Sequence, residues 1–202
     1  MKWLFNPENP VMRALSALAD LMILNLLTLL CCLPVVTMGA ALTALNSAVI
    51  KLVQGEDSSP SKDFFRAFRQ NFKKGTLLGL VFQVFFIAAF VDFLLAESVI
   101  PIFRPVIAAT ALLALLLGQY AFALLARYEN TLKGTLKNAF LLAVGYFPRT
   151  LGMALFNVAL WLLATQLFSY LVPMVFLFGL SLPCYTKILL MRGIFKNLEN
   201  TK

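Results

Sequence analysis

The chain has 202 residues, of which 61% are hydrophobic and only 13% are charged, and its formal net charge is +8. Soluble domains carry about a quarter charged residues, so this composition excludes an ordinary water-soluble fold and predicts a single all-α transmembrane domain over residues 1–202. The three cysteines, Cys31, Cys32 and Cys184, lie in apolar runs and give no disulfide framework. The chain has no histidine to act as a metal ligand or general base.

The chain opens with a predicted helical hairpin over residues 11–53. Its first helix ends at Pro34, because proline interrupts a helix. Thr37 is the predicted cap of the second helix, which is small-residue rich and reaches about Val53. We expect both helices to cross the bilayer and the other helices to pack around them.

A polar interval follows, and residues 61–74 within it form an amphipathic pattern. One helical face carries aromatic residues and the other carries basic residues: Phe64, Phe65, Phe68 and Phe72 against Lys62, Arg66, Arg69 and Lys73. This pattern is typical of a helix that lies in the membrane interface and contacts anionic lipids. The alternative is a cytosolic helix packed on the bundle.

Residues 75–125 are predicted to form a second hairpin, with helices at 75–96 and 106–125. The first of these helices begins with Gly75 and Gly79, a small-xxx-small pattern that permits close helix approach.

The second polar interval contains a candidate second interfacial helix at 135–147, which ends before Pro148. A third hairpin over 151–190 then completes about six spans. Its helices are separated at Pro173.

Every Lys and Arg except Arg104 falls on the side of the two termini. This asymmetry predicts a multi-pass protein of the inner (plasma) membrane with both termini in the cytoplasm. Because topology explains the basic charge, we expect no nucleic-acid partner.

Asp20 is the most informative single residue, since a carboxylate within a span costs roughly 2.5–3.5 kcal/mol to insert. It is interpreted either as a proton or substrate site or as one half of a lock between helices, and the lock is favoured. Lys187 and Arg149 are the expected partners by depth.

The remaining intramembrane polar candidates are Asp92, near the outer end of its span with Glu97 and Arg104, and a set of mid-span amides. Such amides usually bond across helices, although a converging set would line a polar path. They are Asn25, Asn46, Gln83, Gln119, Asn157 and Gln166.

No nucleotide-binding, zinc-protease or serine-hydrolase motif is present, so we expect no catalytic residue, no metal and no cofactor.

Four blocks of the chain resemble the YesL-like family of small bacterial membrane proteins, a domain of unknown function. They are residues 6–45, 63–77, 136–151 and 182–197; in the first block, Asp20, Leu21, Asn25, Leu33, Pro34, Val36, Thr37 and Gly39 stand where the family pattern has them. The family often occurs beside carbohydrate ABC transporters and sensor kinases in Gram-positive bacteria. The resemblance therefore implies a link with sugar uptake, and it carries over no site residue.

Residues 129–148 also resemble the cytoplasmic coupling loop of ABC importer permeases in having an acidic residue, a glycine and a later proline. The spacing differs by about a residue in two places and the usual alanines are absent.

Together these features favour a non-enzymatic accessory or regulatory protein of carbohydrate uptake, with ABC sugar-transporter subunits or a second copy as partners. The alternative is a transporter or channel-like carrier in its own right, and the third is a membrane-embedded enzyme.

Overall fold

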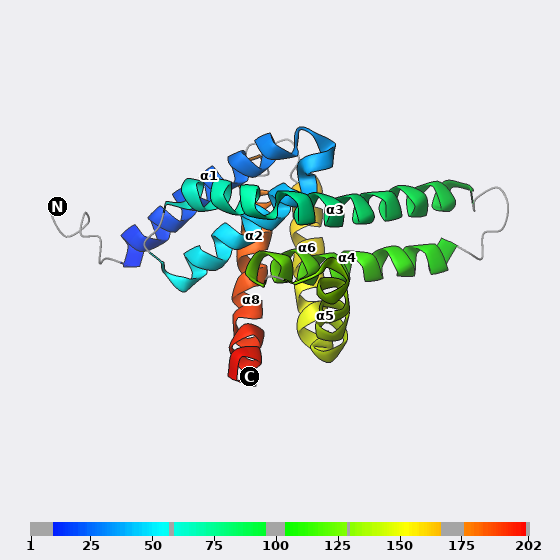
Figure 1. The fold of residues 1–202 in the computed structure, drawn as a ribbon. Helices are drawn as coiled ribbons and strands as arrows, with labels where there is room; N and C mark the ends of the chain where they lie inside the picture. Colours follow the sequence, from blue (N-terminus) through cyan, green and yellow to red (C-terminus); the bar gives the residue numbers. More distant parts are fainter. Residues whose placement is uncertain (1–9, 57–58, 96–103, 129, 167–175, 201–202) are drawn as a thin grey trace.

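A computed structural model describes residues 10–56, 59–95, 104–128, 130–166 and 176–200, and these form helices and no strand (Figure 1). The all-α fold predicted from composition is therefore confirmed. The elements are α1 (Pro10–Cys32), the 3-10 helix η1 (Val35–Thr37), α2 (Met38–Gln54), α3 (Pro60–Leu95), α4 (Arg104–Arg127), α5 (Leu132–Gly145), α6 (Phe147–Gln166) and α8 (Ser181–Asn200).

Within the described residues, four helices are long and apolar enough to cross a membrane: α1, α2, α3 and α4. A fifth span results if α5 and α6, which are bent by 94° relative to each other, count as one. Six spans is therefore an approximate number. The predicted third hairpin includes residues 167–175, which lie outside the described part of the chain.

The second helix, α2, is the centre of the fold. It packs against α1, α3, α4 and α8, and most of its length is buried, including Ala41, Ala44 and Val49. Its apolar residues therefore contact other helices more than lipid. By contrast, the far halves of α3 and α4 form a hairpin that projects from the body of the molecule with little of its surface covered (Figure 1).

Three glycines bring α2 and α3 into backbone contact. A Cβ atom added at Gly39 would lie 2.5 Å from the Cα of Gly79, and one added at Gly75 would lie 2.9 Å from the Cα of Ala40. Both distances are shorter than any ordinary carbon contact. The close helix approach predicted from Gly75 and Gly79 is thus confirmed. The residue of α2 that lies against these two glycines is Gly39.

The amphipathic segment 61–74 is not a separate helix, because α3 runs without a break from Pro60 to Leu95. Phe64 is fully buried and Phe68 is half-buried in the protein core, whereas Phe65 and Phe72 remain exposed. Part of the aromatic face assigned to lipid therefore packs on the bundle, which was the alternative interpretation.

Thr37 does not cap α2 with its side chain. Its hydroxyl instead donates to the carbonyl oxygens of Cys31 at 2.7 Å and Pro34 at 2.9 Å, so it satisfies acceptors at the end of α1. Hydroxyl groups often bond backward in this way, which the local sequence does not distinguish from capping.

The chain bends at Tyr146 rather than at Pro148, which lies in the first turn of α6 where proline is tolerated. The helix before the bend, α5, starts at Leu132, where Thr131 accepts a 3.2 Å hydrogen bond from the Gly134 amide. The last helix continues to Asn200, beyond the predicted end at residue 190.

We predict that Gly39→Ala lowers the melting temperature of the purified protein in mild detergent. The new methyl group must displace the α3 backbone, and overpacking of this kind costs about 1–3 kcal/mol. Gly152→Ala is the matched control, since a Cβ atom there has no neighbour within 4 Å and alanine favours the helix. Equal melting of the two variants would contradict the contact.

Candidate functional site

Asn25 of α1 holds the start of α8. Its side-chain oxygen accepts from the backbone amides of Leu180 at 2.8 Å and Ser181 at 3.0 Å, and its side-chain nitrogen donates to the carbonyl of Phe176 at 2.6 Å. The side chain is fully buried. A helix begins with amides that lack internal partners, so Asn25 supplies from α1 the cap that α8 does not provide itself.

Lys187 of α8 is buried, and its ammonium donates to the side-chain oxygen of Asn46 on α2 at 2.6 Å. Asn46 in turn donates to the carbonyl of Leu42, one turn earlier in α2. A buried charge requires such a partner, and this bond joins the last helix to the central one.

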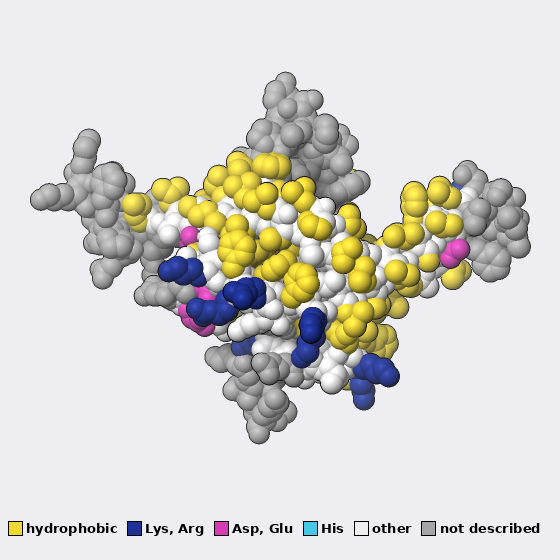
Figure 2. All heavy atoms as spheres, turned by 45° about the horizontal axis from the view of Figure 1, so that its top comes forward, with side chains coloured by type: hydrophobic (Ala, Val, Ile, Leu, Met, Phe, Trp, Pro, Cys, Tyr) yellow, Lys and Arg dark blue, Asp and Glu magenta, His cyan; other side chains and the backbone are white. Residues whose placement is uncertain are grey.

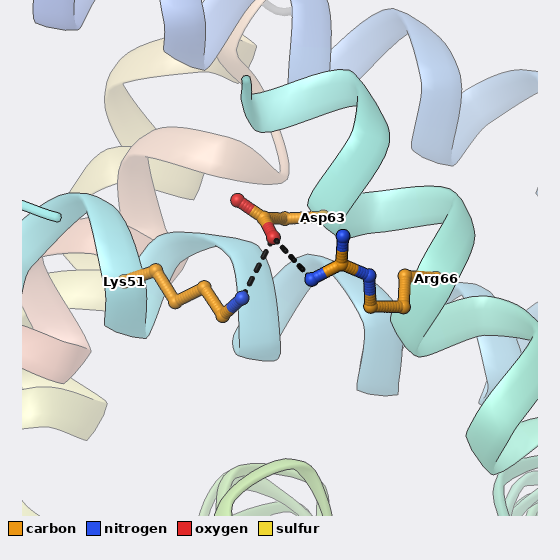
Figure 3. A network of polar contacts seen from close by, with 3 residues as sticks. All are labelled: Lys51, Asp63 and Arg66. Carbon is orange, nitrogen blue, oxygen red and sulfur yellow. Dashed lines mark hydrogen bonds and ion pairs between the residues drawn. The ribbon is translucent and has the colours of Figure 1, made fainter. Parts of the chain in front are cut away.

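An ion cluster lies at the connected end of the α2–α3 hairpin, beside the short turn between the two helices (Figure 3). Lys51 lies 2.7 Å from the Oδ1 atom of Asp63, and Arg66 lies 3.9 Å from the same atom. The Asp63 side chain is 5% exposed and that of Lys51 is 30% exposed, so this pair is more protected from solvent than an ordinary surface bridge.

The bend between α5 and α6 is fixed by Thr150. Its hydroxyl lies 3.1 Å from the carbonyl oxygens of Ala143 and Tyr146 and 2.9 Å from the Tyr120 hydroxyl on α4. Tyr120 is fully buried, so α4 anchors the bend from the protein interior.

Two of the other predicted amides also bond within the chain. Gln83 of α3 donates to the carbonyl of Val35 in η1 at 2.7 Å, and Asn157 donates to the carbonyl of Met153 in its own helix at 2.7 Å. Gln119 is half-buried on α4 and Asp92 is exposed near the end of α3. The Gln166 side chain lies outside the described part of the structure.

The partners predicted for Asp20 were wrong. Lys187 bonds to Asn46, while Arg149 is exposed on α6, with its guanidinium 5.5 Å from the ring of Tyr146. Asp20 itself is half-exposed, and no ion pair to it is present among the described residues. Equal depth along two helices does not bring their side chains together, and Lys187 faces Asn46 of α2 instead.

The surface divides into apolar and basic areas. Figure 2 shows a broad field of hydrophobic side chains, with Lys and Arg gathered beside it rather than within it. On α3 four exposed basic residues form one stripe at helical spacing: Lys62, Arg66, Arg69 and Lys73. Lys74 beside them is exposed as well. This division is typical of a protein whose apolar surface lies in lipid and whose charged surface lies in water.

The long apolar helices and internally bonded polar residues define the class: a helical integral membrane protein. Within it, residues 21–93 match the profile of a family described as protein of unknown function, DUF624, to which YesL-like proteins belong. The resemblance predicted from the sequence is confirmed over these residues. No curated protein and no solved structure matches the chain.

We predict that Asn25→Leu destabilises the protein by about 1–3 kcal/mol, because it leaves buried amides of α8 without an acceptor. Asn157→Leu should change stability much less, since Asn157 is half-buried and bonds only to its own helix. Thermal unfolding of both variants in the same detergent measures the difference. Similar melting temperatures would show that the α1–α8 bonds do not stabilise the fold.

For Asp20 we predict nearly unchanged melting in both Asp20→Asn and Asp20→Leu, within about 0.5 kcal/mol, as for a surface substitution. The reason is its partial exposure and the lack of an ion-pair partner for it within the described part of the chain. A lower melting temperature for Asp20→Leu, with that of Asp20→Asn unchanged, would instead support the interhelical lock.

Proposed function

We propose that the chain is a non-enzymatic accessory or regulatory component of carbohydrate uptake by an ABC-type importer. It lies in the inner (plasma) membrane with both termini in the cytoplasm, as the distribution of Lys and Arg favours. The link with sugar uptake rests on the resemblance to YesL-like proteins.

The observation that carries the proposal is the bonding of three amides within the long helices. Asn25, Asn46 and Gln83 all bond to backbone or side chains of neighbouring elements. A carrier needs polar groups that face a path and exchange their partners with the substrate. Amides already bonded at 2.6 to 2.8 Å serve the fold instead, which favours an accessory role over a carrier.

The proposed contact with the importer is the outer side of α5. This helix packs on α4, and its buried residues are Thr135, Ala139, Leu142 and Ala143. Its opposite side is exposed and combines two cations with large apolar side chains: Lys133, Lys137, Phe140, Leu141 and Val144. A mixed basic and apolar surface suits a protein partner with acidic groups around an apolar centre.

Residues 129–148, which share features with the coupling loop of importer permeases, include all of α5. The helix lies at the bend to α6, next to the basic residues Arg127 and Arg149. Its place at the basic end of the molecule agrees with contact on the cytoplasmic side.

We predict that subunits of a carbohydrate ABC importer co-purify with the tagged protein in mild detergent. The triple variant Lys133→Glu, Lys137→Glu, Leu141→Ser should reduce their recovery on the order of tenfold, since loss of a few central contacts costs at least 1.4 kcal/mol. Quantitative mass spectrometry measures the recovery.

The matched control is Lys62→Glu with Lys73→Glu, which makes the same charge change on the exposed stripe of α3. An equal loss in the control would indicate a general effect of charge. Sugar uptake by liposomes that contain this protein alone would instead establish the carrier alternative.

A further inference from the structure

The turn between α1 and α2 lies beside the middle of α3 rather than at its far end (Figure 1). Gln83 fixes this position, because its side-chain nitrogen donates to the Val35 carbonyl at 2.7 Å and lies 3.7 Å from the sulfur of Met38. The α3–α4 hairpin continues well beyond this turn. The two hairpins therefore reach different depths along the same axis.

The depth of the turn follows from the charges on α3. No charged residue lies between Lys74 and Asp92, and Gln83 is midway between them. At the rise of an α-helix it is about 13 Å from each charge. Since the hydrocarbon core of a bilayer is about 30 Å thick, Gln83 and the turn beside it lie close to the centre of the core.

The lengths of α1 and α2 agree with this depth. No charged residue lies between Asp20 and Lys51. Each of these two charges is about 21 Å along its helix from the turn. A turn at the centre, about 15 Å deep, places both charges just outside the hydrocarbon, whereas two full spans would bring them into it.

The side chains of the turn fit lipid and not water. Leu33 is 76% exposed, Val35 66% and Val36 53%, and Pro34 between them is also exposed. A turn at the outer aqueous surface would be expected to expose polar groups. Here the exposed surface is entirely apolar.

Three carbonyl groups of the turn accept hydrogen bonds from within the protein, as an irregular segment in hydrocarbon requires. The Thr37 hydroxyl donates to the carbonyls of Cys31 and Pro34, and Gln83 donates to that of Val35. In addition, the Thr37 amide donates to the Pro34 carbonyl at 2.9 Å. Two polar side chains thus supply donors to three carbonyls beside the helix break.

We infer that α1, η1 and α2 form a re-entrant hairpin that enters the bilayer from the basic side of the protein and turns at its centre. Its apolar tip, residues 33–38, is an interaction surface for the ends of lipid acyl chains. The hairpin crosses no membrane, although α1 and α2 are each long and apolar enough to do so. This inference is independent of the proposed function.

A re-entrant hairpin also accounts for Asp20 without a lock or a proton site. At about 21 Å from the turn its carboxylate reaches the headgroup region, where water and lipid cations solvate it. Lys51 reaches the same level on α2, where it joins the cluster with Asp63 and Arg66 (Figure 3).

Depth-dependent fluorescence quenching tests the inference on the full chain in liposomes. A single cysteine, Val36→Cys, is placed in a background in which Cys31, Cys32 and Cys184 are replaced by alanine, and it is labelled with an environment-sensitive fluorophore. The liposomes contain lipids with a nitroxide either at the end of the acyl chain or on the headgroup.

Three matched positions calibrate the depth scale. Val84→Cys reports the middle of α3, Leu94→Cys its far end and Glu56→Cys the basic side, and all three residues are exposed. We expect the label at Val36 to be quenched more strongly by the chain-end nitroxide, with the same deep-to-shallow ratio as Val84. Leu94 and Glu56 should show the reverse order.

A Val36 profile like that of Leu94 would show that the hairpin spans the bilayer and would overturn the inference. Weak quenching by both nitroxides would also overturn it, since the tip would then be covered by protein, for example a second copy. If the cysteine-free background does not fold, Val36→Trp and Val84→Trp in a Trp3→Phe, Trp161→Phe background give the same comparison.

Discussion

The contact between α2 and α3 at Gly39, Gly75 and Gly79 determines where the other helices lie. Because no side chain separates the two backbones there, α2 fits against the near half of α3 along its whole length, from Gly79 back to the ion pair of Lys51 with Asp63. Once α2 is fixed in this way, its remaining sides are available to α1, α4 and α8. The bundle is thus built around a buried helix.

Polar residues complete this arrangement by bonding between elements that are remote in sequence. Asn25 joins α1 to α8, Lys187 joins α8 to α2, and Gln83 joins α3 to η1. Each bond satisfies a group that would be costly to bury alone. Apolar packing alone leaves helices in lipid free to slide or rotate, whereas these directional bonds select one arrangement.

The sequence predicts the class, the position of α1, α2 and α4 and the close approach at Gly75 and Gly79, because these depend on local composition and spacing. It did not predict that Phe64 is buried in protein, since an apolar face has the same periodicity against lipid and against a helix. The partners of Asn25 and Lys187 lie more than a hundred residues away and leave no local signal. The pairing of Asp20 with Lys187 or Arg149 is a wrong prediction, because equal depth along two helices does not place their side chains on facing sides.

The capping of α8 by Asn25 has a consequence for biosynthesis. The groups that Asn25 bonds are 151 to 156 residues further along the chain. At about 5–20 residues per second, the ribosome needs about 8–30 s to make them after it has made Asn25. During that interval the amide of α1 has none of its final partners, so a chain truncated before Phe176 retains an unsatisfied polar group that distinguishes it from the finished protein.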